Sequence, residues 1–206
     1  MKIGVIGSGL MGSALGTSWA HAGHQVLFSY SRDRRKLETL AHRAGHGAAA
    51  VSPAEAASAD AVLIAVPWRA LEDALAEAGS LRGRTVITCM LPMTDDDERL
   101  AVGFTSSGAE TLAQKTGAHV VAAFNTVWSD VIRSRMTASD APPSLFYVGD
   151  DASAKATAVQ LIRDAKFDPV DAGSLQDARL LEPFGLLMGK LGFAYNPQVA
   201  YRFLKP

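Results

Sequence analysis

The sequence predicts an α/β protein, with a doubly wound, mostly parallel sheet and a small C-terminal helical segment. Strand-like apolar runs alternate with helix-like segments along most of the chain. These runs are continuously apolar, as expected of parallel strands that are covered on both faces. A glycine-rich turn directly follows the first run. The 206 residues suffice for one main domain with an appendage, which we place at residues 1–170 and 171–206.

The elements are predicted in order from these signals. Residues 2–7 form an apolar run bounded by glycine, and residues 10–22 show helical spacing that Gly23 ends. Further strands are predicted at residues 25–30, 48–51, 60–66, 84–90, 119–124 and 145–148, with a last segment from Phe167. Further helices are predicted at residues 34–44, after Ser52-Pro53, and at residues 69–78, 108–115, 153–165 and 174–191.

Composition excludes several classes of function. The chain has 20 Lys and Arg residues and 21 Asp and Glu residues, so it lacks the surplus of basic residues that is typical of nucleic-acid binders. The N-terminal segment resembles a signal peptide, but closely spaced glycines interrupt it, and no window has the ~18 apolar residues of a membrane span. We therefore expect a cytoplasmic protein that binds neither nucleic acid nor membrane.

The cysteine, the acidic run and the histidines are expected to have structural or surface positions rather than catalytic or metal-binding roles. Cys89 is the one cysteine and lies in an apolar run, so we expect a buried core residue. The acidic residues 95–98 are expected to form a solvated loop without a metal ion. None of the five histidines lies in a catalytic motif, and His24 and His119 are expected at the far end of the sheet.

The glycine-rich turn has the form G-x-G-x-x-G, which is weak evidence alone but stronger between a predicted strand and a predicted helix. Gly7 permits the tight turn, Gly9 allows the pyrophosphate to approach the backbone, and Gly12 lets the helix contact the strand. The helix N-terminus supplies free N–H groups for the phosphates. The cofactor-binding positions predicted here are Gly7, Ser8, Gly9, Leu10, Met11 and Gly12.

The end of the second predicted strand indicates NADP rather than NAD. NAD sites place an acid there, whereas this chain has Ser31 and Arg32, which suit a 2′-phosphate. Asp33 falls after the strand and can cap the following helix. Lys36, one turn beyond Arg32, reaches toward the same phosphate. Arg34 and Arg35 are interpreted as a solvated helix face.

Val66, Pro67 and Trp68 follow the clearest buried strand, at the strand end where the nicotinamide half of the cofactor binds. A strand-ending proline with a core tryptophan explains the same residues equally well. Both interpretations remain open at this stage.

These motifs resemble the NADPH-dependent reductases of the 5-deazaflavin coenzyme F-420 and, less closely, the NADPH–flavin domain of the membrane metalloreductases. The matching residues cover almost the whole chain. They are Gly7 to Gly12, Ser31-Arg32 with Lys36, Val66-Pro67-Trp68, residues 121–126, residues 171–175 and residues 178–182. The last two segments are the most specific, because other dinucleotide-binding enzymes of this fold lack them.

The resemblance implies a Rossmann fold and a hydride passed between NADP(H) and a bound deazaflavin or flavin (FMN or FAD). It implies that Asn125 and Thr126 position the two rings, and that Phe184, Leu187 and Met188 form a wall of the acceptor cleft. Direct transfer needs orientation rather than a catalytic acid or base, so we expect no catalytic side chain. Tyr30 is an additional residue before the Ser-Arg pair, and Trp128 adds bulk after Thr126.

Other functions remain as alternatives. One is an NADPH:flavin reductase on the same scaffold, and another is a non-catalytic NADP(H)-binding sensor. A hydroxyacid dehydrogenase or imine reductase is disfavoured, because those enzymes append a large helical domain for which only some forty residues remain. The expected partner is a small redox substrate, and the apolar C-terminal segment is compatible with a homodimer.

Overall fold

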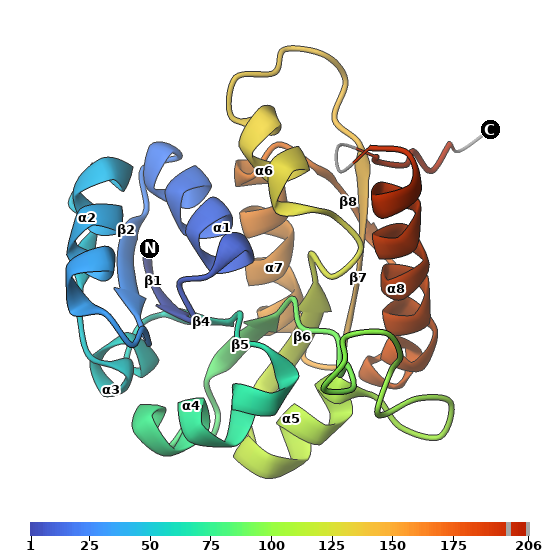
Figure 1. Ribbon diagram of the computed structural model, residues 1–206, viewed down its shortest axis with the longest axis horizontal. Helices are drawn as coiled ribbons and strands as arrows, with labels where there is room; N and C mark the ends of the chain where they lie inside the picture. The colour runs from blue at the N-terminus through green and yellow to red at the C-terminus, as the bar shows by residue number, and fades with distance from the viewer. Residues whose placement is uncertain (197–198, 205–206) are drawn as a thin grey trace.

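An eight-stranded sheet forms the centre of the molecule in a computed structural model that describes residues 1–196 and 199–204 (Figure 1). Its strands are β1 (Lys2–Ile6), β2 (Gln25–Ser29), β3 (Ala49–Ala50), β4 (Ala61–Ile64), β5 (Thr85–Thr88), β6 (His119–Ala123), β7 (Ser144–Gly149) and β8 (Asp168–Asp171). They lie in the order β3-β2-β1-β4-β5-β6-β7-β8, and every neighbouring pair is parallel except β6 and β7. The predicted doubly wound, mostly parallel sheet is confirmed.

Helices cover both faces of the sheet. They are α1 (Leu10–His21), α2 (Arg34–Ala44), α3 (Pro53–Ala57), η1 (Trp68–Ala70), α4 (Leu71–Ala78), α5 (Gly108–Thr116), α6 (Ser129–Arg135), α7 (Ala152–Asp164), η2 (Leu175–Asp177) and α8 (Ala178–Ala194). One buried apolar cluster joins α1, α2, α6 and α7 to the sheet. A second cluster joins α3, α4, α5 and the start of α8 to the other face. No helix in the described part of the chain is long and apolar enough to cross a membrane.

The sequence-based elements are largely correct, with ends that shift by up to three residues; the helix predicted at residues 174–191 is η2 followed by α8, which ends at Ala194. Helix α6 was not predicted, because it has only seven residues and begins without a side-chain cap. The Arg133 guanidinium secures it by donating to the Ser129 hydroxyl at 2.9 Å and to the Leu10 carbonyl at 3.2 Å. The segment after Phe167 is the edge strand β8.

Buried polar contacts fix α1 against α7. The Trp19 indole is fully buried and donates its N–H to the Leu161 carbonyl at 2.9 Å. His24 is buried at the start of β2, with its Nε2 2.8 Å from an Asp164 carboxylate oxygen. This contact lies at the amino ends of the strands, as expected for a structural histidine.

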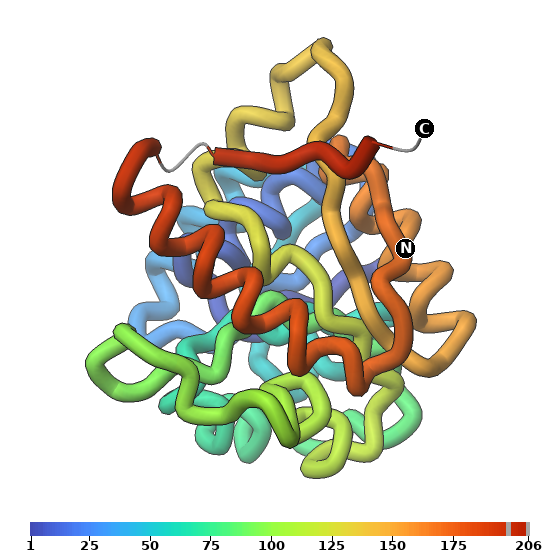
Figure 2. The backbone as a smooth tube through the Cα atoms, turned by 90° about the vertical axis from the view of Figure 1, so that its right-hand side faces the viewer, coloured from blue at the N-terminus to red at the C-terminus, as the bar shows by residue number. Residues whose placement is uncertain are grey.

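The C-terminal residues return to the sheet after α8, which runs obliquely along one side of the molecule (Figure 2). The Ser144 N–H donates to the Tyr201 carbonyl at 3.0 Å, and the Phe203 N–H donates to the Ser144 hydroxyl at 2.8 Å. The Tyr201 hydroxyl accepts from the Phe146 N–H at 3.1 Å. Residues 199–204 thus lie beside β7, on the same side as α8.

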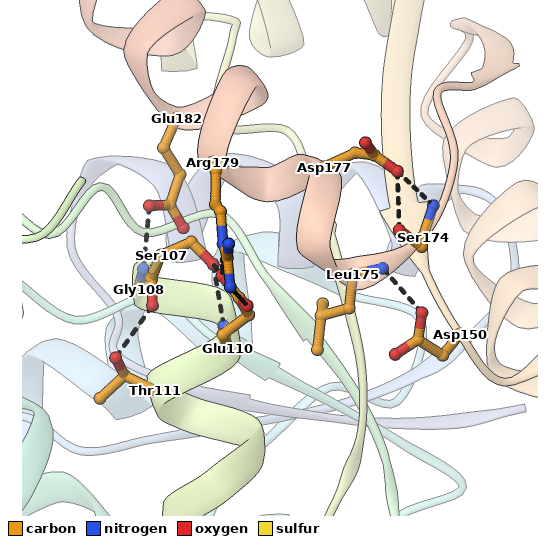
Figure 3. A network of polar contacts seen from close by, with 10 residues as sticks. All are labelled: Ser107, Gly108, Glu110, Thr111, Asp150, Ser174, Leu175, Asp177, Arg179 and Glu182. Atoms are coloured by element: carbon orange, nitrogen blue, oxygen red, sulfur yellow. Dashed lines mark hydrogen bonds and ion pairs between the residues drawn. The ribbon is translucent and has the colours of Figure 1, made fainter. Parts of the chain in front are cut away.

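A polar network anchors the start of α8 to α5 (Figure 3). Glu182 of α8 is 2% exposed, and its two carboxylate oxygens accept from the Gly108 and Ala109 N–H groups at 2.9 and 3.0 Å. These are free N–H groups at the helix N-terminus, where a carboxylate is favoured. The Arg179 guanidinium binds both oxygens of Glu110 at 2.9 and 2.6 Å.

Burial raises the pKa of Glu182 to about 7, although the two N–H donors oppose the shift. Because the folded pKa lies above the ordinary value of 4.5, the folded protein binds this proton more tightly than the unfolded chain does. The contribution of Glu182 to stability therefore falls as pH rises from about 4.5 through about 7.

We predict that Glu182→Gln removes this pH dependence, because the amide stays neutral. Between about pH 5 and pH 8 the wild type should lose up to about 3 kcal/mol more unfolding free energy than the variant, as measured by urea unfolding. Glu38→Gln is the control, since Glu38 is exposed and pairs with Arg34 on the surface of α2. It should keep the wild-type slope, and an equal slope in all three proteins would contradict the role of Glu182.

Candidate functional site

A continuous groove runs along the carboxyl ends of β1, β2, β4, β5 and β6. The strand order reverses between the neighbouring strands β1 and β4, because β2 and β3 lie on one side of β1 and β4 lies on the other. Doubly wound proteins bind their ligands at this point. A turn cavity of about 700 Å³ begins at the glycine-rich turn and Tyr30. An inner cavity of about 420 Å³ shares Gly9 and residues 65–67 with it. The two cavities therefore form one groove.

The glycine-rich turn has the geometry that its sequence predicts. Gly7 has a φ of +105°, and a Cβ there would lie 2.5 Å from the Ala65 carbonyl oxygen. A Cβ on Gly12 would lie 1.8 Å from the Gly7 carbonyl oxygen. A Cβ on Gly9 would meet nothing within 4 Å, and Gly9 precedes α1 without a side-chain cap. The groove thus has open backbone and free N–H groups where a pyrophosphate would bind.

The motif's other side chains differ in position. Ser8 lines the turn cavity, and Met11 lines the inner cavity. Leu10 also lines the inner cavity and is 72% exposed at the helix start.

Tyr30, the additional residue after β2, adopts a left-handed backbone conformation that turns the chain. Its φ is +59°, and its hydroxyl donates to Asp73 of α4 at 2.7 Å. Burial and then this acceptor raise the pKa of Tyr30 to about 12. The turn leaves Ser31 and Arg32 in the wall of the turn cavity, where the sequence analysis places them.

Two cations line the turn cavity in the described chain: Arg69, which pairs with Asp97 at 3.4 Å, and Arg32. Arg32 is exposed, and within residues 1–196 and 199–204 no hydrogen bond or ion pair engages its guanidinium. The Ser31 hydroxyl bonds the backbone of Asp33 at 3.2 Å, and Asp33 caps α2 through the Arg35 N–H at 3.0 Å. The cap predicted for Asp33 is confirmed. Lys36 is exposed on the first turn of α2, outside the cavity wall.

The loop after β4 borders both parts of the groove. Val66 is buried and Pro67 is exposed, and both line the turn cavity and the inner cavity. Trp68 is half-buried at the start of η1 and lines the inner cavity. Trp68 is therefore a wall of the groove as well as part of the core packing.

Asn125 is an unpaired polar group in the inner cavity. It follows β6, is 7% exposed, and neither its Nδ2 nor its Oδ1 has a hydrogen-bond partner in the described residues. An unpaired buried group costs roughly 1–3 kcal/mol, so this amide is suited to a ligand. The neighbouring Thr126 is fully buried, and its hydroxyl bonds the Tyr201 hydroxyl at 2.9 Å.

The residues of α8 that line the inner cavity differ from those that the family resemblance implies. Gly185 and Gly189 line the inner cavity, whereas Phe184, Leu187 and Met188 do not. Phe184 packs on Phe146 and Tyr201, and Leu187 is 51% exposed. Met188 is buried, and its carbonyl accepts from the Trp128 indole N–H at 3.3 Å. None of the three residues that the resemblance implies lines this cavity, because contacts between distant residues decide which face of α8 meets the sheet.

Residues after β5 complete the wall, and the sequence analysis did not place them there. Cys89, Met90, Leu91 and Met93 line the inner cavity. Cys89 is buried as predicted, and burial raises the pKa of its thiol to about 12. Among the described residues of this wall, Cys89 and Asp97 are the titratable ones. Because the Cys89 thiol stays protonated and Asp97 pairs with Arg69 at 3.4 Å, the cavity suits chemistry that depends on orientation rather than on an acid or base.

Comparisons with known proteins agree with this geometry. Residues 2–92 match a family model described as NADP oxidoreductase, coenzyme F-420-dependent. A protein assigned as an F-420-dependent NADP-reductase, from Arthrobacter sp. FB24, is 24% identical over 100% of both chains, with a TM-score of 0.87. A hypothetical protein from Sinorhizobium meliloti is 26% identical over 86% of this chain and 87% of that chain, with a TM-score of 0.76.

A more distant similarity concerns the fold alone. A reductive aminase from Aspergillus terreus, solved with NADPH and ethyl-5-oxohexanoate, is 22% identical with a TM-score of 0.65. The similarity covers 94% of this chain but 62% of the aminase. The family match over residues 2–92 confirms the resemblance that the sequence predicts, to the NADP oxidoreductases that depend on coenzyme F-420.

Proposed function

We propose that this protein is a cytoplasmic oxidoreductase that transfers a hydride directly between NADP(H) and coenzyme F-420. The observation that carries the proposal is the unpaired Asn125 amide, which lies in an apolar cavity that continues the groove from the glycine-rich turn. A carboxamide on a nicotinamide ring presents one donor and one acceptor group, which complement the two free atoms of Asn125.

Each part of the groove then has a role. The turn from Gly7 to Gly12 and the start of α1 hold the pyrophosphate, and Ser31 and Arg32 hold the 2′-phosphate, with Lys36 nearby. Residues 66–68 and Asn125 hold the nicotinamide, while Thr126 fixes the loop through Tyr201. When bound, NADPH supplies a hydride from C4 to C5 of the deazaflavin, and solvent supplies the accompanying proton. The shape of the cavity orders the two rings against each other.

A flavin (FMN or FAD) has the same three-ring outline, so cavity shape supports an NADPH:flavin reductase as the second candidate. A non-catalytic NADP(H)-binding sensor is the third candidate, because the nicotinamide by itself would also occupy the inner cavity.

We predict that the purified protein oxidises NADPH when coenzyme F-420 is supplied. Separate absorbance assays with FMN, FAD and riboflavin provide the comparison. Turnover with flavins alone would make the protein a flavin reductase, and tight NADPH binding without turnover on any ring would favour the sensor.

We predict that Arg32→Ala raises the Kd for NADPH about tenfold or more, because a charge-assisted pair with the 2′-phosphate is lost. The Kd for NADH, measured by the same fluorescence titration, should change little. Arg35→Ala is the matched control, since Arg35 is exposed outside the cavity wall. Equal losses for both cofactors would refute the 2′-phosphate assignment.

We predict that Asn125→Leu lowers kcat/KM for NADPH at least tenfold while leaving the Tm unchanged or higher. The substitution removes an unpaired buried amide without removing any internal hydrogen bond. Thr126→Val is the contrasting variant, because it breaks the bond to Tyr201 and should lower the Tm. A fall in Tm for Asn125→Leu would show that the amide has a structural role instead.

A further inference from the structure

Arg69 and Asp97 form an ion pair that joins the two parts of the groove. Arg69 lies on η1 in the wall of the turn cavity, and Asp97 lies in the wall of the inner cavity. The Arg69 Nη1 lies 3.4 and 3.5 Å from the two carboxylate oxygens of Asp97. Because the two cavities meet at Gly9 and residues 65–67, the pair lies near the place where a pyrophosphate would bind.

This ion pair is weak. Its side chains are 53% and 65% exposed, and an exposed pair gains little from its opposite charges in water. Both contacts are long and use one nitrogen of Arg69, whereas Arg179 binds Glu110 through two nitrogens at 2.9 and 2.6 Å. The Nε and Nη2 atoms of Arg69 have no hydrogen-bond partner within the described residues. A more highly charged anion can therefore take Arg69 from Asp97.

The hairpin that carries Asp97 does not depend on Arg69 for its shape. An antiparallel bridge closes residues 93–100, and the Thr94 N–H donates to the Arg99 carbonyl at 2.8 Å. Asp97 lies at the tip with a φ of +57°, a left-handed conformation that aspartate and asparagine tolerate better than most residues. Its exposed carboxylate is solvated by water when Arg69 leaves. Loss of the ion pair therefore costs the folded protein little.

A bound cofactor supplies the stronger anion. A pyrophosphate carries a negative charge on each phosphate, and a guanidinium can bind phosphate oxygens through two N–H groups at once. The described wall of the turn cavity has two cations, and Arg32, which follows β2, is the one assigned to the 2′-phosphate. Arg69 follows Pro67, at the boundary that both cavities share, and is the cation left for the pyrophosphate.

We infer that Arg69 changes partner when NADP(H) binds, from Asp97 to the pyrophosphate of the cofactor, and that Asp97 thereby limits the affinity for the cofactor. This inference rests on the proposed function, because it takes the groove as the site of NADP(H). The pyrophosphate is common to NADPH and NADH. Arg69 therefore acts on both cofactors alike, in contrast to Arg32.

The test is a double-mutant cycle, measured by fluorescence titration with NADPH and with NADH at low ionic strength, where exposed charges are least screened. Arg69→Ala should raise both Kd values about fivefold, because the contact with the pyrophosphate is lost. Asp97→Asn keeps the left-handed tip but releases Arg69, and should lower both Kd values about two- to fivefold. In the Arg69→Ala background, Asp97→Asn should change the Kd values less than about 1.5-fold.

Glu98→Gln is the matched control for the loss of charge. Glu98 is the neighbouring exposed acid on the same hairpin, and its carboxylate has no ion pair among the described residues. The variant removes one negative charge, as Asp97→Asn does, and should leave both Kd values unchanged. The Tm of every variant should stay within about 1 °C of the wild type, because the altered side chains are exposed.

Three results would overturn the exchange of partners. An unchanged Kd in Arg69→Ala would show that Arg69 does not bind the cofactor, and an effect confined to NADPH would exclude the pyrophosphate as its partner. An equal gain in affinity from Asp97→Asn with and without Arg69 would be a general effect of charge. A loss of affinity in Asp97→Asn would show that Asp97 holds Arg69 in place for the cofactor instead of competing for it.

The outcomes also separate this inference from the proposed function. A wild type that binds NADPH and shows the expected cycle, without turnover on coenzyme F-420 or a flavin, supports the exchange and contradicts the proposed reaction. Turnover with coenzyme F-420 but without coupling between Arg69 and Asp97 supports the reaction and overturns the exchange. A wild type that does not bind NADPH overturns both.

Discussion

The buried carboxylate of Glu182 is the contact on which the candidate site depends. It binds the two N–H groups at the start of α5 and so holds α8 across the carboxyl edge of the sheet. The ion pair between Arg179 and Glu110 repeats this connection at the next turn of the helix (Figure 3). Without α8 in this position, the groove after β5 and β6 would be open to solvent on one side. Two residues of the segment 178–182, Arg179 and Glu182, thus connect α8 to α5.

Two glycines leave open backbone in the wall of the groove. Gly9 lies at the start of α1 and Gly189 in the middle of α8, and each leaves space in front of its Cα that the protein does not fill. Between them lies Asn125, which is buried without a hydrogen-bond partner in the described chain. The unpaired amide of Asn125 makes the folded protein less stable than an apolar side chain would, and glycine at position 189 is a weaker helix former than alanine. Such local losses of folding stability are typical of ligand-binding sites.

The chemistry of the inner cavity follows from the environment of its side chains. Burial keeps the Cys89 thiol protonated, and the Thr126 hydroxyl is engaged by Tyr201. The described wall offers shape, a mainly apolar lining, one free amide and the Asp97 carboxylate, which pairs with Arg69. Such a wall can hold two rings in contact, which is the requirement of direct hydride transfer. The fold alone does not specify that reaction, since the Aspergillus reductive aminase shares it at 22% identity.

The sequence by itself determined the sheet, most of its helices, the glycine-rich turn and the Ser31-Arg32 pair at the end of β2. These features depend on local spacing and on backbone rules that hold wherever a strand, a turn and a helix follow one another. The tertiary structure alone decided that β7 runs antiparallel, that α6 exists, and that Gly185 and Gly189 rather than Phe184, Leu187 and Met188 form the wall. The physical reason is that periodicity gives a helix its faces, whereas contacts between distant residues, here those of Glu182 and Trp128, decide which face meets the site.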